Sequence, residues 1–236
     1  MAKKPKLQQS TLTASLERDA FEKARRALMR RDPILAPIIK KHRERSLVDA
    51  PAVDPFSALV RTITAQQIST KAAATIHGRL VALMPGGIAT PDALLALTDD
   101  QMRVAGLSRQ KTSYLRDLAA KVLAAELPIH SLHEMADEEV IDAIVKVKGL
   151  GRWSAEMFLM FRLRRPDVLP VDDLGIRKGV QAVDKLEAMP PPKWLIERGE
   201  KWGPYRTYAS LYLWRIADLA NAPKTKDAKP VKRSQG

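Results

Sequence analysis

The chain has 236 residues, 45% of them hydrophobic, which is enough for one large or two small domains with a hydrophobic core. It contains no cysteine, which excludes disulfides, zinc sites with thiolate ligands and cysteine-bound iron-sulfur clusters. The formal charge of +13 favours a polyanionic partner such as nucleic acid, although the two tails hold +7 of it. We expect these tails, residues 1–14 and 221–236, to be basic and flexible, adding salt-sensitive attraction to nucleic acid.

No apolar run approaches the roughly eighteen residues of a membrane span, and the N-terminus lacks the apolar core of a signal peptide. We therefore expect a soluble, intracellular monomer without a membrane partner. It would lie in the cytoplasm or nucleoid, or in the nucleus if the source is eukaryotic.

Residues 15–220 have the pattern of an all-α protein, with many short helices and no strand pattern. Helices over 15–44 should be interrupted at Asp32-Pro33, because proline disfavours helix in the residue before it. Phe56 to Ile63 should form the next helix. Later helices are predicted to begin at the capping residues Ser69, Thr90, Thr98 and Ser108, and Ser131-x-x-Glu134 repeats the capping-box spacing.

Two amphipathic segments within residues 139–164 flank the turn Lys148-Gly149-Leu150-Gly151. The two glycines permit positive φ and let another molecule approach the backbone closely. Their amides sit at the start of a helix, where unpaired N–H groups attract an anion such as phosphate. Taken alone, the turn is equally well explained by a glycine that ends one helix before the next begins.

Residues 145–155, Val-Lys-Val-Lys-Gly-Leu-Gly-Arg-Trp-Ser-Ala, resemble the hairpin of the helix-hairpin-helix DNA glycosylases. In that superfamily an aspartate follows the hairpin by roughly twenty residues, and Asp173 in Asp-Asp-Leu-Gly-Ile-Arg matches it. The resemblance covers about residues 50–218 and is closest to a compact form of the 3-methyladenine DNA glycosylase II branch. It implies a two-lobed helical fold with the active site between the lobes.

The resemblance makes Asp173 the catalytic carboxylate, which would stabilise a cationic sugar and orient water during cleavage of an N-glycosidic bond. Asp172 and Asp173 would otherwise be explained as capping residues of the helix at Leu174, and Asp172 remains the alternative. Members that also cut the strand carry a lysine two residues after the second hairpin glycine, where this chain has Trp153. We therefore expect a monofunctional enzyme without lyase activity.

Further positions follow from the same resemblance. Trp153 and Trp214 match base-pocket positions, although both could simply be core residues, and Met157 stands where some relatives have an aromatic residue. Gln67 matches the wedge that fills the gap left by a flipped nucleotide, although an exposed loop glutamine is the simpler explanation.

We expect the hairpin to bind DNA phosphate. We also expect the protein to require no cofactor. Phosphate contacts are assigned by resemblance to Lys148, Gly149, Leu150, Gly151 and Ser154. The carbonyls of Val145, Val147 and Leu150 could hold a monovalent cation, whereas the histidines form no side-chain metal pattern. The expected partner is double-stranded DNA containing alkylated bases.

Two other functions stay open at this point. Helix-hairpin-helix turns also occur in proteins that only bind duplex backbones, but such a protein has no use for a carboxylate near DNA phosphates. A glycosylase for oxidised or mismatched bases would more naturally carry the hairpin lysine or cluster cysteines, and neither is present. The preferred lesion depends on pocket shape, which the sequence does not reveal.

Overall fold

The computed structural model describes residues 6–42 and 54–221, and these ranges form helices and turns without a strand. Their α-helices are α1 (Lys6–Arg31), α2 (Ala36–Lys41), α3 (Pro55–Ala65), α4 (Thr70–Ala82), α5 (Pro91–Ala96), α6 (Asp99–Ala105), α7 (Arg109–Leu123), α8 (Asp137–Val145), α9 (Arg152–Phe161), α10 (Leu174–Asp184), α11 (Pro192–Gly199) and α12 (Arg206–Asn221). The all-α prediction is confirmed. None of the described helices is both long enough and apolar enough to cross a bilayer.

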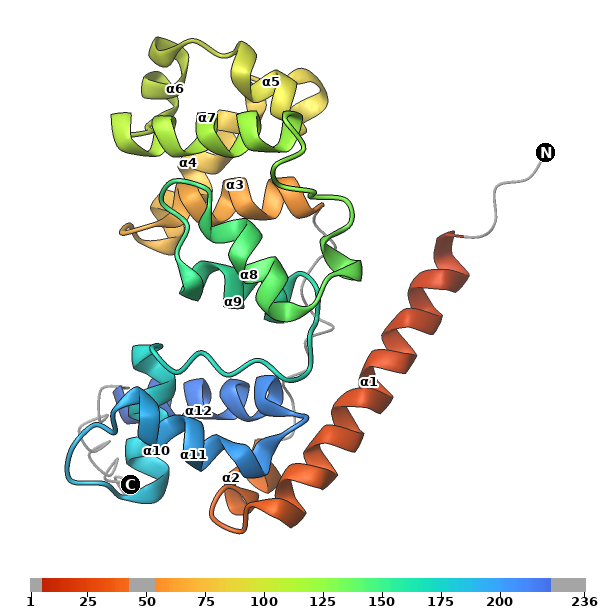
Figure 1. Cartoon of the computed structure of the whole chain (residues 1–236), viewed down its shortest axis with the longest axis vertical. Coiled ribbons are helices and arrows are strands. Elements are labelled where there is room, and N and C mark those ends of the chain that lie inside the picture. Colours follow the sequence, from red (N-terminus) through yellow and green to blue (C-terminus); the bar gives the residue numbers. More distant parts are fainter. Residues whose placement is uncertain (1–5, 43–53, 222–236) are drawn as a thin grey trace, which may run out of the picture.

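The helices form two lobes, which Figure 1 shows one above the other. One lobe contains α3 to α9 around a core that includes Leu59, Ile63 and Leu115; the other contains α1, α2 and α10 to α12 around a core that includes Ile176 and Trp202. Trp214 packs against both cores. The junction of the lobes is therefore next to this indole.

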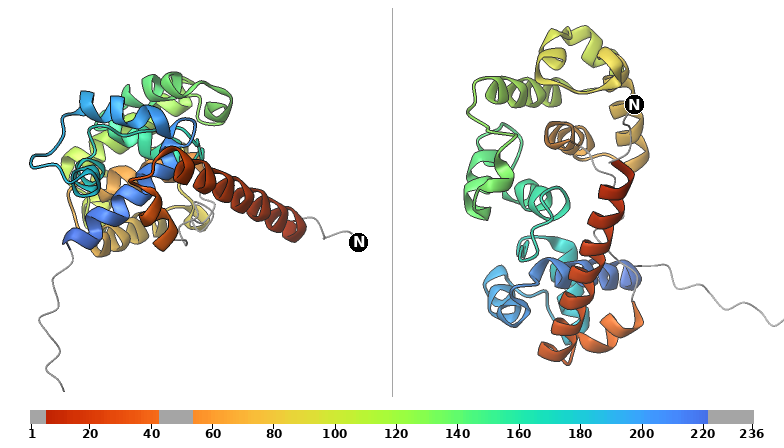
Figure 2. Two further views of the ribbon diagram at one scale, coloured as in Figure 1. Left: turned by 90° about the horizontal axis from the view of Figure 1, so that it is seen from below. Right: turned by 90° about the vertical axis from the view of Figure 1, so that its right-hand side faces the viewer.

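The N-terminal helix begins earlier than expected. It starts at Lys6, so residues 6–14, expected to be flexible, are helical, and its first part projects from the body in Figure 2. The helix ends at Arg31, immediately before the expected interruption at Asp32-Pro33. The segments 1–5 and 222–236 lie outside the described residues.

The Asp32 carboxylate anchors this end of α1. It is fully buried and accepts hydrogen bonds from Arg198 at 2.6 Å and from the indole of Trp202 at 2.7 Å. These charge-assisted bonds offset the cost of burying the carboxylate. They connect the α1–α2 turn to α11 and the residues after it.

Capping residues define most helix starts as predicted. The side chains of Ser69, Thr90, Thr98 and Ser108 each accept a hydrogen bond from a backbone N–H in the first turn that follows. The box expected at Ser131-x-x-Glu134 is wrong: Ser131 has no side-chain cap and precedes only a short 3-10 turn. Helix α8 begins at Asp137 instead, where the Glu139 carboxylate accepts the Ala136 N–H at 2.8 Å.

Helices α10 and α12 pack with their backbones close together because glycines lie on the contact face. A Cβ added at Gly179 would lie 2.2 Å from the Leu213 carbonyl oxygen, and one at Gly175 would lie 2.7 Å from Cδ1 of Trp214. The spacing of four residues places both glycines on one face of α10. This contact brings Trp214 to the first turn of α10.

Candidate active site

The hairpin consists of α8, a turn over residues 146–151, and α9. Gly149 adopts a left-handed φ of 80°, and a Cβ there would lie 2.1 Å from the ring of Tyr114. Gly151 differs from the expectation, because its φ of −101° is open to any residue and nothing lies within 4 Å of an added Cβ. Gly149 is therefore required by conformation and packing, whereas Gly151 keeps the start of α9 open.

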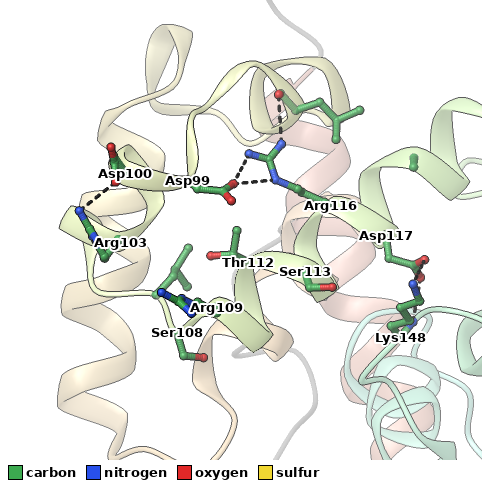
Figure 3. Close-up of a pocket in the computed structure, with 13 residues that line it drawn as sticks. Asp99, Asp100, Arg103, Ser108, Arg109, Thr112, Ser113, Arg116, Asp117 and Lys148 are labelled. Carbon is green, nitrogen blue, oxygen red and sulfur yellow. Dashed lines mark hydrogen bonds and ion pairs between the residues drawn. The ribbon is translucent and has the colours of Figure 1, made fainter.

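The turn is fastened to α7 by Asp117, on the side shown in Figure 3. The backbone N–H of Lys148 donates to the Asp117 carboxylate at 2.8 Å, and the Lys148 ammonium lies 3.9 Å from the other oxygen. The Lys148 amide is thus occupied inside the protein. Its exposed ammonium remains available near the hairpin surface.

The start of α9 is the part of the hairpin best suited to an anion. Gly151 is its N-cap residue and supplies no side-chain cap, so the first backbone N–H groups of the helix lack that acceptor. Ser154 lies in the first turn and is buried. The phosphate contacts assigned to this turn stay a prediction.

Asp173 is the N-cap residue of α10 and is buried between the two predicted pocket tryptophans. Its Oδ1 accepts the Ile176 N–H at 2.8 Å and the Trp214 indole N–H at 2.7 Å. Its Oδ2 accepts the Trp153 indole N–H at 2.7 Å. The same side chain therefore caps α10 and accepts hydrogen bonds from the two tryptophans predicted for the base pocket, whereas its catalytic role stays a prediction.

This hydrogen bonding leaves Asp173 with one unused acceptor position. An ionised carboxylate has about four lone-pair sites, two on each oxygen. Two bonds occupy Oδ1, and Trp153 occupies one site on Oδ2. The remaining lone-pair site on Oδ2 is available to accept a hydrogen bond from a water molecule.

Asp172 faces a different environment from its neighbour. It is exposed, and its charge contributes to raising the pKa of the buried Glu156. Burial is the main cause of that shift, which brings the pKa of Glu156 to about 7, and Arg152 opposes it. Arg152 pairs with Glu156 within α9 at 3.1 Å and with Glu138 at 2.6 Å, and the second pair ties α9 to α8.

Trp214 is held on several sides. Its ring stacks on Phe161, with centroids 5.9 Å apart and planes 22° from parallel. The missing side chain of Gly175 leaves room for the indole edge. One face of Trp214 is thus already covered by Phe161, whereas Trp153 is 48% exposed.

A cavity of about 690 Å³ brings several predicted residues together. Gln67, Gly149, Trp153, Ser154 and Met157 all line it. Asp173 and Trp214 do not line this cavity. Asp173 accepts a hydrogen bond from Trp153, which does line it, and Trp214 donates to the other Asp173 oxygen. The cavity is large enough for a purine-sized base.

The sequence did not predict the other residues that line this cavity, among them Gln66, Lys111 and Tyr114. Lys111 donates to the Thr64 carbonyl at 2.8 Å, and burial lowers the pKa of its ammonium. Gln66 donates to the Gly149 carbonyl at 2.7 Å. Only their position beside the recognised wedge and hairpin could have suggested them.

A second cavity, of about 980 Å³, lies on the α6–α7 side of the molecule (Figure 3). Of the predicted site residues only Lys148 lines it. Two of its arginines are paired, Arg103 with Asp100 at 2.8 Å and Arg116 with Asp99 at 2.6 Å. No tryptophan lines this second cavity, so it has no carboxylate between two indole N–H groups of the kind found at Asp173.

The carbonyls named for a monovalent cation lie in or beside the hairpin turn. Val147 and Leu150 are buried, and the Val147 carbonyl accepts the Leu150 N–H at 3.1 Å, which leaves it one lone pair. Backbone oxygens of this kind suit a hard cation. Among the described residues no group of three or more acidic or histidine side chains could hold a metal ion.

Comparison with known proteins identifies the family of the chain. Residues 60–204 match the HhH-GPD superfamily of base excision DNA repair proteins, and the chain belongs to that family. The DNA-3-methyladenine glycosylase 1 of Schizosaccharomyces pombe is 34% identical over 181 residues, which are 76% of this chain and 78% of that protein.

Solved structures show the same fold. A DNA-3-methyladenine glycosidase from Bacillus halodurans superposes with a TM-score of 0.73 at 36% identity, over 81% of this chain and 87% of that one. The 3-methyladenine DNA glycosylase of Schizosaccharomyces pombe, solved in complex with abasic DNA, gives a TM-score of 0.70 at 30% identity, over 84% and 98% of the two chains.

Proposed function

We propose that the protein is a monofunctional DNA glycosylase that hydrolyses the N-glycosidic bond of alkylated purines flipped out of duplex DNA. The observation that carries this proposal is the buried Asp173 carboxylate between the indole N–H groups of Trp153 and Trp214. The relatives named as 3-methyladenine glycosylases support the alkylated purine as substrate.

The mechanism uses charge and position rather than a strong acid. A base that already carries a positive charge is a good leaving group, so stabilising the cationic sugar is the main task of the protein. Asp173 supplies that negative charge, and the two indoles fix its oxygens. Its unused acceptor site on Oδ2 orients the water that attacks the anomeric carbon.

Trp153 decides between hydrolysis and strand cleavage. It occupies the position at which the resemblance expects a lysine in strand-cutting members, and an indole cannot form a Schiff base. Its exposed ring lies at the cavity, where it can stack on an electron-poor alkylated base. The leaving base then separates from an intact abasic strand.

The hairpin would hold the DNA without reading its sequence. Backbone N–H groups at the start of α9 and the Lys148 ammonium bind phosphates, with a monovalent cation on the hairpin carbonyls as a further bridge. The proposed enzyme needs no other cofactor. It acts as a monomer on double-stranded DNA. The structure of the Schizosaccharomyces pombe relative in complex with abasic DNA supports DNA as the partner.

Duplexes carrying single defined lesions test this function. We expect release of 3-methyladenine or 7-methylguanine, with strand breaks appearing only after alkali. Borohydride should trap no adduct. A trapped adduct would contradict the monofunctional mechanism, and its absence from a Lys111→Arg variant would identify the cavity lysine as the amine. Binding of every duplex without release of any base would favour a non-catalytic protein.

A further inference from the structure

A single side-chain hydrogen bond joins the loop between α3 and α4 to the hairpin. Gln66 Nε2 donates to the carbonyl oxygen of Gly149 at 2.7 Å, across 83 positions of sequence. Gly149 is held by its left-handed φ and by the Tyr114 ring against which it packs. The loop is therefore attached to the most constrained residue of the turn.

The residue after Gln66 is the predicted wedge, and it has a strained backbone. Gln67 is exposed and has a φ of 56°, a conformation that costs a residue with a side chain about 1–2 kcal/mol. Such a conformation persists only where the surroundings hold it. The local backbone bond is weak, since the Gln66 N–H lies 3.4 Å from the Ile63 carbonyl.

A second contact steadies the same loop from α7. The Lys111 ammonium donates to the carbonyl of Thr64 at 2.8 Å, near the end of α3. It holds the loop before Gln66, whereas the Gln66 amide is the contact next to Gln67 itself. Two residues beyond Gly149, the chain reaches Gly151 and the start of α9, where phosphate would bind.

We propose that Gln66 is a positioning residue that sets the wedge Gln67 at a fixed place relative to the phosphate bound by the hairpin. This inference rests on the proposed function and deepens it. Because Gly149 belongs to the hairpin, docking on the DNA backbone also places the loop. Through this hydrogen bond, a hairpin that has bound a phosphate also holds Gln67 at the position from which it enters the base stack.

Gln66→Glu tests the proposal, because it keeps the size of the side chain but removes the donor to Gly149. Base release from a lesion duplex should fall about tenfold, as expected for loss of one good hydrogen bond. Undamaged duplex should bind within about twofold of the wild type, because the phosphate contacts are intact. The matched control is Gln181→Glu, which removes a similar donor to the Glu187 carbonyl in the other lobe and should change neither quantity.

A double-mutant cycle separates positioning from general stability. If Gln66 acts through the wedge, Gln66→Ala should reduce base release about tenfold alone but less than about twofold in a Gln67→Ala background. A purely structural role predicts equal losses in both backgrounds. Equal losses, with thermal unfolding lowered in step, would overturn the proposal.

A readout without base release keeps this inference separate from the proposed function. The probe is a duplex with a tetrahydrofuran abasic analogue opposite 2-aminopurine, whose fluorescence changes when a wedge enters the stack. A smaller change for Gln66→Glu than for wild type and Gln181→Glu supports the proposal even if no lesion is hydrolysed. An unchanged signal in Gln66→Glu would refute it even in an active enzyme.

Discussion

The two hairpin glycines provide a prediction in which stability and DNA binding separate. In Gly149→Ala the alanine must keep the left-handed φ of 80°, which costs about 1–2 kcal/mol. Its Cβ would also lie 2.1 Å from the Tyr114 ring. Displacing a packed ring adds about 1–3 kcal/mol. The free energy of unfolding should therefore fall by about 3 kcal/mol, which corresponds to a Tm lower by roughly 6–12 °C in a chain of this size.

Gly151→Ala should behave in the opposite way. Its φ of −101° and the open space around it allow alanine without strain, so the Tm should stay level or rise slightly. The added methyl group would instead stand at the start of α9 and keep a phosphate away from its N–H groups. Affinity should fall about tenfold or more, the value of one lost charge-assisted hydrogen bond.

Thermal unfolding and fluorescence anisotropy on undamaged and lesion duplexes measure these effects. The loss in Gly151→Ala should be the same for both duplexes, because phosphate contacts carry no sequence information. A loss confined to the lesion duplex, or a lower Tm in Gly151→Ala, would refute the assignment of phosphate binding to this turn.

The remaining predictions concern the surroundings of Asp173. Trp214→Phe removes the indole donor to Oδ1, so single-turnover base release should fall about tenfold while duplex affinity is kept; equal loss of both would contradict the role. Glu156 has a folded-state pKa of about 7 against an ordinary value of 4.5, so the folded protein binds the extra proton between these values and loses stability as the pH rises through 7. Denaturant titrations from pH 5 to 8 should show the free energy of unfolding of the wild type decline by up to about 3 kcal/mol relative to that of Glu156→Gln. A difference that rises over this range would show that Glu156 is ionised by its Arg152 partner.

Local signals predicted the elements better than the contacts between them. Ser69 and Ser108 cap helices as their spacing indicates, because capping depends on residues within one turn. The capping box predicted at Ser131 and Glu134 does not form. Helix α8 is capped instead by Glu139, which accepts the Ala136 N–H, and the local sequence does not distinguish the two glutamates. Tertiary packing decides such cases.

The structure brings several of the predicted site residues together at one cavity, but the contacts between them could not be predicted from the sequence. Asp173 could be selected by its distance from the hairpin, but its bond to Trp214 spans 41 residues and depends on the close packing of α10 on α12. The φ of Gly151 differed from the expectation, because a glycine in the sequence permits a left-handed backbone but does not require one. The Gln66 contact with Gly149 has no sequence signature.

The measurement that tests the central claim most directly is single-turnover base release by Asp173→Asn on a duplex with a defined alkylated purine. Asparagine can still cap α10 and accept the Trp214 bond, although its amide would face the Trp153 donor. The variant should bind the duplex within about twofold of wild type and release base at least about a hundredfold more slowly, which is about 3 kcal/mol of barrier. Asp172→Asn is the matched control, because this neighbour is exposed, and it should stay active. Full activity in Asp173→Asn, or the same loss in Asp172→Asn alone, would contradict the account.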